Sequence, residues 1–377
     1  MLDLSRQYIP IREEILAALA DVVDNRQFIL GQPVAAFERA AAGHLNVAEA
    51  VGCASGTDAL WLALAAAEIG PGSAVVTTPF SFFASVSSIV RAGAKPLLSD
   101  IDPVTFNLDP AGVELLLQQP QPVPVKALLP VHLYGQCVPW PAFAQLGERY
   151  GLALIEDAAQ AWGSGWDGKS AGSLGDIAAF SFYPTKNLSA AGDAGLVTTN
   201  NPRLAERARM LRQHGMRERY HHDEMGWNAR MDGFQGAVLG VHLKYITQRN
   251  AMRREAALRY TQLFADAGLA ESGVYPDRGV ILPKEIEGSQ HIWHQYVIRA
   301  PRRDALREYL TSRQIGSEIY YPVPLHLQKA LEYLGYGIGS FPETERAAHE
   351  VLALPIFPEI RADEQERVVA AVAEFLS

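Results

Sequence analysis

The sequence predicts an α/β protein with a large, mostly parallel sheet domain and a smaller C-terminal α+β domain. Short apolar strands alternate with helix-length segments over the first two-thirds of the chain, a pattern typical of an open sheet covered on both faces. With 377 residues and 48% hydrophobic content, the chain can build one large core and a second, smaller one. Charged side chains also follow two of the strands, at the edge where such sheets bind ligands.

The elements of the large domain are expected in a regular order. A strand at 50–52 leads into a helix at 57–68, which Gly70-Pro71-Gly72 ends. Because helix-length segments separate the strands, we expect parallel pairing. The remaining strands are expected at 74–77, 95–99, 125–130, 152–155, 177–182 and 195–198, with helices at 83–92 and from Asp109-Pro110 to 118.

A long helical pattern then runs from about 232 to 267, with Phe234, Val238, Val241 and Tyr245 on one face. Its length suits a bridge between two domains. We therefore divide the chain into a large domain, residues 1–245, and a small domain, residues 246–377, with the N-terminal segment expected against the small one. In the small domain we expect a strand at 294–299, a helix at 302–313 and a closing helix at 363–375.

Composition and charge argue against several classes of function. The chain has 33 Lys and Arg against 42 Asp and Glu, a net charge of −9, which disfavours a general surface for nucleic acid or anionic membranes. Cys53 and Cys137 are too few for a disulfide framework, and no apolar stretch is long enough to cross a bilayer. The first residues lack a signal-peptide pattern, so the expected location is the cytoplasm.

Two charged side chains carry the chemical prediction. Lys186 stands just beyond the apolar strand at 177–182, and Asp157 follows the apolar strand at 152–155. An enzyme that uses pyridoxal 5′-phosphate (PLP) needs a lysine that forms a Schiff base and an aspartate that keeps the pyridine nitrogen protonated. Most lysines are ordinary surface residues, but Pro184 and the buried strand beside Lys186 weaken that interpretation.

A second group of residues suits a phosphate. Ser55, Gly56 and Thr57 stand where a strand turns into a helix, and the N–H groups and dipole of a helix N-terminus favour an anion. Plain helix capping by Ser55 or Thr57 explains the same pattern. Ser181, the polar residue within the 177–182 strand, would project toward the same pocket, with a satisfied core serine as the alternative.

Three further side chains have competing interpretations. Phe82 is a candidate for stacking on the pyridine ring, but an aromatic here is also a candidate core residue, and periodicity does not choose among Phe80, Phe82 and Phe83. Gln160, one helical turn beyond Asp157, could reach the ring hydroxyl. Glu156 and Asp157 could instead form a paired acid and base or a magnesium site.

Two other motifs have simpler explanations. Residues 163–170 match a P-loop, but a strand rather than a helix follows them, so we reject nucleotide hydrolysis and expect a turn-rich loop that exposes Lys169. Residues 221–224, His-His-Asp-Glu, look metal-like. Consecutive side chains cannot all converge on one ion, so we expect a polar loop and no metal site.

Taken together, segments along nearly the whole chain resemble the DegT/DnrJ/EryC1/StrS family of PLP-dependent sugar aminotransferases. Each motif is weak alone, and it is their order that makes the resemblance specific. The sequence departs from the family at residues 192–195, Gly-Asp-Ala-Gly, where Gly-Glu-Gly-Gly is common, which bears on the loop beyond Lys186. The motifs that match are Phe28-Ile29-Leu30-Gly31, Ser55-Gly56-Thr57-Asp58-Ala59-Leu60, Val131-His132-Leu133-Tyr134-Gly135, Glu156-Asp157-Ala158-Ala159-Gln160, Ser181-Phe182-Tyr183-Pro184-Thr185-Lys186, Gly226-Trp227-Asn228-Ala229-Arg230-Met231 and Tyr321-Pro322-Val323-Pro324-Leu325-His326.

The resemblance implies fold type I of the PLP-dependent aminotransferases and a role for each candidate residue. Lys186 would hold PLP covalently, Asp157 would pair with the ring nitrogen, Gln160 would pair with the ring oxygen, and Phe82 would stack on the ring. Asn228 would reach the phosphate from a neighbouring subunit, which implies a homodimer with shared sites. The other phosphate ligands would be Ser55, Gly56, Thr57 and Ser181, and the residues near the sugar would be Tyr183, Tyr321 and His326.

The implied reaction moves an amino group from a donor, expected to be glutamate, to a keto group of a nucleotide-linked deoxysugar. Residues 215–220 resemble members that act at C3, so C3 is favoured over the alternative, C4. A non-catalytic regulator or sensor on the same fold is the other alternative, and the presence of both Lys186 and Asp157 argues against it. No nucleic acid or membrane partner is expected.

Overall fold

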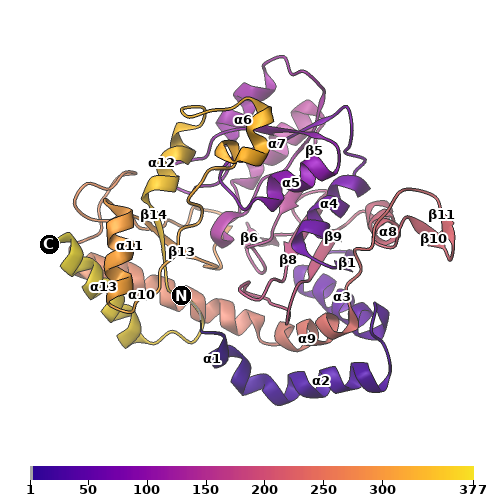
Figure 1. Ribbon diagram of the computed structural model, residues 1–377, viewed down its shortest axis with the longest axis horizontal. Helices are drawn as coiled ribbons and strands as arrows, with labels where there is room; N and C mark the ends of the chain where they lie inside the picture. The colour runs from indigo at the N-terminus through magenta and orange to yellow at the C-terminus, as the bar shows by residue number, and fades with distance from the viewer. Residues whose placement is uncertain (1–2) are drawn as a thin grey trace.

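The computed structural model describes residues 3–377 and shows a seven-stranded sheet flanked by helices, with a smaller unit at the C-terminal end of the chain (Figure 1). The prediction of an α/β protein on a mostly parallel sheet is confirmed. The strands lie in the order β1 (Glu49–Cys53), β9 (Gly195–Thr199), β8 (Ile177–Ser181), β5 (Ala153–Asp157), β4 (Val125–Leu128), β2 (Ala74–Thr77) and β3 (Lys95–Leu98).

One strand departs from the expected parallel pairing. β9 runs antiparallel to both of its neighbours, β8 and β1, whereas the other neighbouring strands pair in parallel. The segment 182–194 that joins β8 to β9 contains no helix. A parallel pair needs a crossover, usually a helix, to bring the chain back to the same edge, so the shorter connection gives an antiparallel strand. The prediction of parallel pairing was wrong for β9.

Helices cover both faces of the sheet because successive side chains of a strand point to opposite sides. On one face, α4 (Gly56–Ala66), α5 (Ala84–Arg91) and α8 (Pro202–Leu211) pack over a core that includes Ile155, Ala179 and Val197. On the other face, α3 (Gly31–Leu45) covers Ala178 and Phe180. Two more helices, α6 (Pro110–Leu117) and α7 (Trp140–Tyr150), cover β2 and β4 on that face.

The long helix expected between the domains is two helices. α9 (Gly233–Leu243) ends before α10 (Ile246–Asp266) begins, so the prediction of a single helix was wrong at this point. The N–H groups of Lys244 and Tyr245 bond to the carbonyls of Val241 and His242, three residues back instead of four, and this tightened turn interrupts the helix. The break lies at residues 244–245, and the division into residues 1–245 and 246–377 stays a prediction.

The N-terminal helices α1 and α2 precede α3, and α2 lies along α9 (Figure 1). The elements not yet described are α1 (Leu4–Tyr8), α2 (Arg12–Asp24), β6 (Gly165–Trp166), β7 (Lys169–Ser170), β10 (Met216–Glu218), β11 (His221–His222), β12 (Ser289–Gln290), β13 (Tyr296–Arg299), α11 (Arg303–Ser312), α12 (Pro342–Glu350), β14 (Val351–Leu354), α13 (Ala362–Leu376) and the 3₁₀ turns at Ile9–Ile11, Leu133–Gly135, Leu325–Leu327 and Lys329–Leu334.

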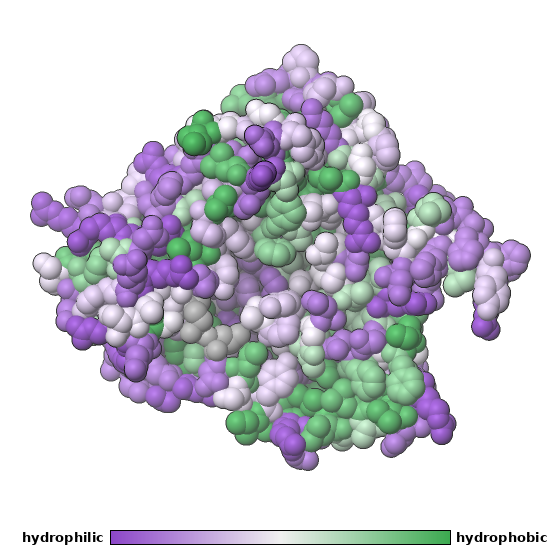
Figure 2. Space-filling view, viewed as in Figure 1, coloured by the Kyte–Doolittle hydropathy of each residue, from purple (hydrophilic) through white to green (hydrophobic). Residues whose placement is uncertain are grey.

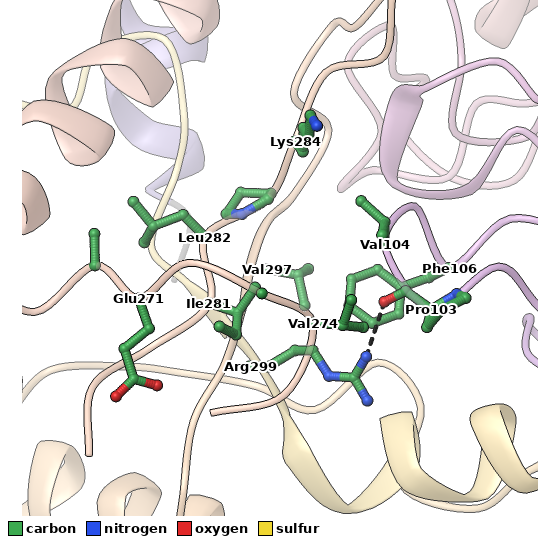
Figure 3. A pocket seen from close by; sticks show the side chains of 13 residues that line it. Pro103, Val104, Phe106, Glu271, Val274, Ile281, Leu282, Lys284, Val297 and Arg299 are labelled. Atoms are coloured by element: carbon green, nitrogen blue, oxygen red, sulfur yellow. Dashed lines mark hydrogen bonds between the residues drawn. The ribbon is translucent and has the colours of Figure 1, made fainter. Parts of the chain in front are cut away.

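Two arginines tie the C-terminal unit to the rest of the chain. Arg6 forms a two-pronged contact with Glu364 of α13, at 2.8 and 2.6 Å. Arg299 of β13 donates to the carbonyl of Pro103 at 2.8 Å and pairs with Glu350 at 2.7 Å. Arg299 lies beside a cavity of about 320 Å³ between the 103–106 loop and the C-terminal unit (Figure 3). These contacts fix the C-terminal unit over the sheet edge where the candidate site lies.

Candidate active site

A cavity of about 790 Å³ opens at the carboxyl ends of the strands, where ligands bind in sheets of this type. Both parts of the chain line it. Residues 1–245 contribute Ser55, Gly56, Thr57, Leu60, Ser81, Phe82, Ala84, Ser85, Val131, Asp157, Ala159, Gln160, Ser181, Tyr183, Thr185, Lys186 and Asp193. Residues 246–377 contribute His294, Gln295, Glu318, Ile319, Tyr320 and Tyr321. The cavity is therefore completed only when the C-terminal unit is docked.

Lys186 lines this cavity from a turn just after β8. Its backbone N–H bonds to the carbonyl of Tyr183 at 2.8 Å, and the next residue, Asn187, is buried and hydrogen bonded. The backbone of Lys186 is thus held on both sides. Burial lowers the pKa of the Lys186 amine to about 8, and the opposing attraction of Asp157 does not cancel the effect. A lysine with a lowered pKa in a cavity is a candidate nucleophile and base.

Asp157 ends β5 on the same cavity and is almost fully buried. One carboxylate oxygen accepts a hydrogen bond from the Ser85 hydroxyl at 2.7 Å, and the other accepts one from the Ala159 N–H at 3.2 Å. Burial raises the pKa of Asp157, while these two donors and the Lys186 amine oppose the rise. A cationic group in the cavity would therefore find an oriented, poorly solvated carboxylate partner.

Glu156, the neighbouring acid, points away from the cavity. Alternation along β5 sends it to the opposite face of the sheet from Asp157. Its carboxylate lies 3.0 Å from Nε2 of His132, which is also buried. The same carboxylate accepts backbone hydrogen bonds, at 2.8 to 2.9 Å, from the N–H groups of Gly172, Leu174 and Gly175. Glu156 therefore anchors the 172–175 loop, and the alternative of a paired acid and base with Asp157 is wrong.

Replacing Glu156 with glutamine should destabilise the cofactor-free protein by about 3 kcal/mol. Each carboxylate oxygen of Glu156 accepts two hydrogen bonds, so an amide nitrogen in either place would face two donors. Urea unfolding measures the change. The matched control is Glu148→Gln, on the exposed surface of α7, which should shift stability by less than about 0.5 kcal/mol. Equal stability of the two variants would contradict the anchoring role.

The other end of the cavity meets the N-terminus of α4. Ser55 is the N-cap, and its hydroxyl accepts from the Asp58 N–H at 3.1 Å, so the capping explanation holds for this residue. Gly56 follows, and a Cβ there would lie 2.5 Å from the Cβ of Ser181. Only glycine allows β8 to approach α4 this closely. The approach brings Ser181 beside the first N–H groups of the helix, an arrangement that favours an anion.

Aromatic and amide side chains form the wall between these two ends. Phe82 lines the cavity and is 60% exposed, and its ring centroid lies 6.3 Å from that of Tyr321. Gln160 lies in a turn, not on the expected helix, and its amide donates to the Tyr321 hydroxyl at 3.0 Å. Tyr183 is also exposed to the cavity. Of the other two aromatics, Phe80 is buried in the core and Phe83 does not line the cavity, so Phe82 stays the candidate for stacking.

Two predicted site residues lie elsewhere in this chain. Asn228 is exposed, and its side-chain oxygen accepts from Arg230 at 3.0 Å. His326 is buried, with Nε2 at 3.0 Å from Glu345 and its ring edge-on to Phe341. Neither residue lines the cavity. Their roles remain predictions, and the role of Asn228 requires a second copy of the chain.

The two rejected motifs lie in hairpins. Residues 165–170 form the β6–β7 hairpin, which pairs with β12, and Lys169 is exposed. Residues 221–224 lie in and after the exposed β10–β11 hairpin. Across residues 3–377, no group of three or more His, Cys, Asp or Glu side chains is placed to hold a metal ion. Over the same residues, no helix combines the length and apolar character that a bilayer crossing requires.

Three cavity residues near the predicted pair, Ser81, Ser85 and His294, escaped the sequence reasoning. Ser85 orients Asp157, and the Ser81 hydroxyl lies 2.8 Å from that of Ser85. The spacing of four residues between Ser81 and Ser85 is a signal that both face one side of a helical turn. His294 comes from the C-terminal unit, and only the docking of that unit brings it to Lys186.

The residues present fit PLP. An amine of low pKa suits a covalent link to an aldehyde, and a buried, oriented carboxylate suits a protonated ring nitrogen. The N-terminus of α4 suits a phosphate, because glycine at position 56 lets Ser181 lie beside the first N–H groups of the helix. All three features line the same cavity.

Comparisons with known proteins agree with this assignment. The model of the DegT/DnrJ/EryC1/StrS aminotransferase family matches residues 10–373. The chain is 46% identical over 375 residues to the pleiotropic regulatory protein of Geobacillus stearothermophilus, covering 100% of this chain and 98% of the relative. It is 39% identical over 376 residues to the UDP-N-acetyl-3-dehydro-alpha-D-glucosamine 3-aminotransferase of Acidithiobacillus ferrooxidans, covering 100% and 97%.

A solved structure gives the same result. DesV of S. venezuelae, determined in complex with a ketimine intermediate, matches with a TM-score of 0.93 and 39% identity. The match covers 100% of this chain and 97% of that chain. The α/β fold built around the cavity is therefore that of a known aminotransferase structure.

Proposed function

The chain belongs to the DegT/DnrJ/EryC1/StrS aminotransferase family, and we propose that it transfers an amino group from glutamate to the 3-keto group of a nucleotide-linked deoxysugar. The observation that carries this proposal is the meeting of Lys186 and Asp157 in one cavity beside the α4 N-terminus. The A. ferrooxidans relative is named for amination at C3 of a UDP-linked sugar, which favours C3 over C4.

PLP, when bound, supplies a ring that takes up the electrons released as a C–H bond of the amino donor breaks. Lys186 is the group that moves the proton. With a pKa of about 8, roughly a tenth of its amine is neutral at pH 7, against far less for an ordinary lysine. The neutral amine would accept the proton that leaves Cα of the donor, hold it as the ammonium and give it up again, and the reverse order would serve the keto sugar.

The other cavity residues bind and orient. Asp157, fixed by Ser85 and the Ala159 N–H, would hold the proton on the ring nitrogen. Gln160, fixed by the Tyr321 hydroxyl, would pair with the ring oxygen. The phosphate would be held by Ser55, Gly56, Thr57 and Ser181, Phe82 would stack on the ring, and Tyr183 and Tyr321 would lie near the sugar.

We also propose that the protein is a cytoplasmic homodimer with shared sites. Among the described residues that line the cavity, Lys186 is the only lysine or arginine, and a second copy of the chain would add donors for the diphosphate of a nucleotide-linked sugar. Exposed apolar side chains gather near α2 and α9, including Leu16, Val23, Phe28 and Ile29 (Figure 2). Such a surface suits contact with a second copy, and the proposed phosphate contact of Asn228, which is exposed, would also need one. Both cysteines are unpaired, as in a reducing compartment.

A regulatory protein is the second candidate, because the G. stearothermophilus relative carries that name. A regulator that only senses a ligand has no need of a proton-carrying lysine poised beside an oriented aspartate. The presence of both side chains in one cavity favours catalysis.

One experiment separates these candidates. The cofactor-loaded protein is mixed with glutamate, and we expect its visible absorbance to fall as an equal amount of 2-oxoglutarate forms. Nucleotide-linked 3-keto and 4-keto sugars are then added separately, and mass spectrometry detects the amino sugar. We expect product from a 3-keto sugar. If only 4-keto sugars give an amino sugar, the reaction takes place at C4. If the cofactor-loaded protein forms no 2-oxoglutarate at all, the regulatory function is favoured.

A further inference from the structure

The backbone of Tyr134 fixes the direction of the hydrogen bonds that lead to the Tyr321 hydroxyl. The N–H of Tyr134 donates to Oε1 of Gln160 at 2.7 Å, and Nε2 of Gln160 lies 3.0 Å from the Tyr321 hydroxyl. A backbone N–H can only donate, so the oxygen of the Gln160 amide must face Tyr134 and its nitrogen must face Tyr321. The Tyr321 oxygen therefore accepts this bond, and the hydrogen of the hydroxyl points elsewhere.

The hydroxyl hydrogen of Tyr321 is available to a ligand in the cavity. In the part of the chain that the structure describes, this hydroxyl has one hydrogen bond, the one that it accepts from Gln160. Tyr321 also lines the cavity. Burial raises the pKa of Tyr321, and the hydrogen bond from Gln160 opposes the rise only in part. The phenol therefore keeps its proton at neutral pH and presents a donor to the cavity.

Packing and an uncommon backbone conformation hold this donor in place. The centroid of the Tyr321 ring lies 6.3 Å from that of Phe80 and 6.3 Å from that of Phe82. Tyr134 has φ +58°, in the left-handed region that residues other than glycine seldom adopt. In this conformation its N–H holds the amide that bonds to Tyr321, while its hydroxyl donates to the carbonyl of Tyr320. One residue thus fixes both the partner of the Tyr321 hydroxyl and the backbone just before Tyr321.

The proposed transfer needs a donor at one particular oxygen atom. As an amino group adds to the keto carbon of the sugar, two carbon–nitrogen bonds replace the two carbon–oxygen bonds, and the oxygen leaves as water with the two hydrogens of the amino group. The electron pair of the opening C=O bond first gathers on the oxygen, so a positioned donor stabilises the transition state. Release of 2-oxoglutarate is the same exchange in reverse, with water adding and a keto oxygen forming.

We propose that Tyr321 donates a hydrogen bond to the keto oxygen of the substrate and stabilises the negative charge that gathers there. This inference rests on the proposed function, because it assigns Tyr321 a role in that reaction. The ring oxygen of PLP does not require the same hydrogen, because Nε2 of Gln160 has a second one. Tyr321 keeps its own proton throughout, since both hydrogens of the departing water come from the amino group.

The test variant is Tyr321→Phe, which keeps the ring that packs against Phe80 and Phe82 and removes the hydroxyl. Tyr260→Phe is the matched control, because Tyr260 is buried outside the cavity and its hydroxyl donates to the carbonyl of Pro355 at 2.9 Å. Each variant loses one hydrogen-bonded phenol hydroxyl, so urea unfolding should show similar losses of stability. The control should keep every rate below within about twofold of wild type.

Single-turnover measurements on the loaded protein separate the steps. In Tyr321→Phe, the visible absorbance should fall after mixing with glutamate at a rate within about threefold of wild type, because this change follows the proton transfer at Cα. Release of 2-oxoglutarate, followed with a coupling enzyme, should slow by about 10²-fold. The reaction of protein loaded with pyridoxamine phosphate with a keto sugar should slow by about the same factor, with the sugar concentration for half-maximal rate within about fivefold of wild type.

Binding gives a readout that needs no turnover. Protein loaded with PLP holds no amino group to transfer, so a nucleotide-linked 3-keto sugar can bind to it without being aminated. Isothermal titration calorimetry should show an affinity for this sugar that is weaker by about threefold to tenfold in Tyr321→Phe, as expected for the loss of one neutral hydrogen bond. The affinity for the matching nucleoside diphosphate, which has no keto oxygen, should equal that of wild type.

Two results would overturn the proposal while leaving the proposed function intact. The first is an unchanged rate of 2-oxoglutarate release and of the sugar reaction in Tyr321→Phe. The second is an equal slowing of the absorbance change, because the hydroxyl would then serve the ring oxygen or the packing of the site. A wild-type protein that forms neither 2-oxoglutarate nor an amino sugar gives a different result, which contradicts the proposed function and this inference with it.

Discussion

Replacing Lys186 with alanine is expected to lower the rate of amino-group transfer by at least about 10⁴-fold. The variant loses the covalent link to PLP and, in the same residue, the amine that carries the proton. In the described part of the chain, no other lysine or arginine lines the cavity and could substitute for it. Coupled measurement of 2-oxoglutarate gives the rate. Retention of more than a tenth of the wild-type rate would contradict the assignment.

The folding of a Lys186 variant can be checked by its stability. Because burial lowers the pKa of Lys186 from 10.5 to about 8, the folded cofactor-free protein binds fewer protons than the unfolded chain between these pH values. The wild type therefore carries a penalty below pH 8 that disappears as the pH rises to 10.5. Lys186→Met should be more stable than wild type by up to about 3 kcal/mol at pH 7. The two proteins should converge above pH 10.5 in urea unfolding.

Asp157→Asn is expected to reduce the transfer rate by about 10²- to 10³-fold. The amide keeps the size of the carboxylate and can still accept from Ser85, but it has no charge to hold the ring nitrogen protonated. The proton on that nitrogen is what makes the ring an electron sink. Both half-reactions should slow together, and stopped-flow absorbance measures each.

A matched variant tests whether this loss comes from the site. Asp176 also accepts a backbone hydrogen bond, from Leu154 at 2.8 Å, but it is exposed and does not line the cavity. Asp176→Asn should keep its activity within about twofold, as expected for a surface substitution outside the cavity. If both variants lost a similar share of the transfer rate, the effect of Asp157→Asn would come from a disturbed fold and not from the site.

Local patterns predicted much of the large domain. β2 was expected at 74–77 and lies at Ala74–Thr77, because an apolar run between turn residues leaves little choice. Lys186 and Asp157 were placed at strand ends from sequence, and in a parallel sheet those ends meet at one edge.

Features that depend on tertiary contacts could not be predicted in the same way. The helical periodicity continues through Lys244 and Tyr245, and neither glycine nor proline marks the break between α9 and α10. His294 reaches the cavity only through the docking of the C-terminal unit, and nothing in its local sequence distinguishes it from a core histidine. His326, whose motif suggested the sugar site, is buried beside Glu345 and does not line the cavity of its own chain, so its role stays a prediction.

The covalent role of Lys186 is the claim on which the mechanism depends, and borohydride reduction tests it directly. The purified protein is loaded with PLP, reduced with borohydride, digested and mapped by mass spectrometry. We predict that the reduced cofactor is found on the peptide containing Lys186 and is absent when glutamate is added before reduction. A cofactor fixed to a different lysine, or to none, would contradict the account.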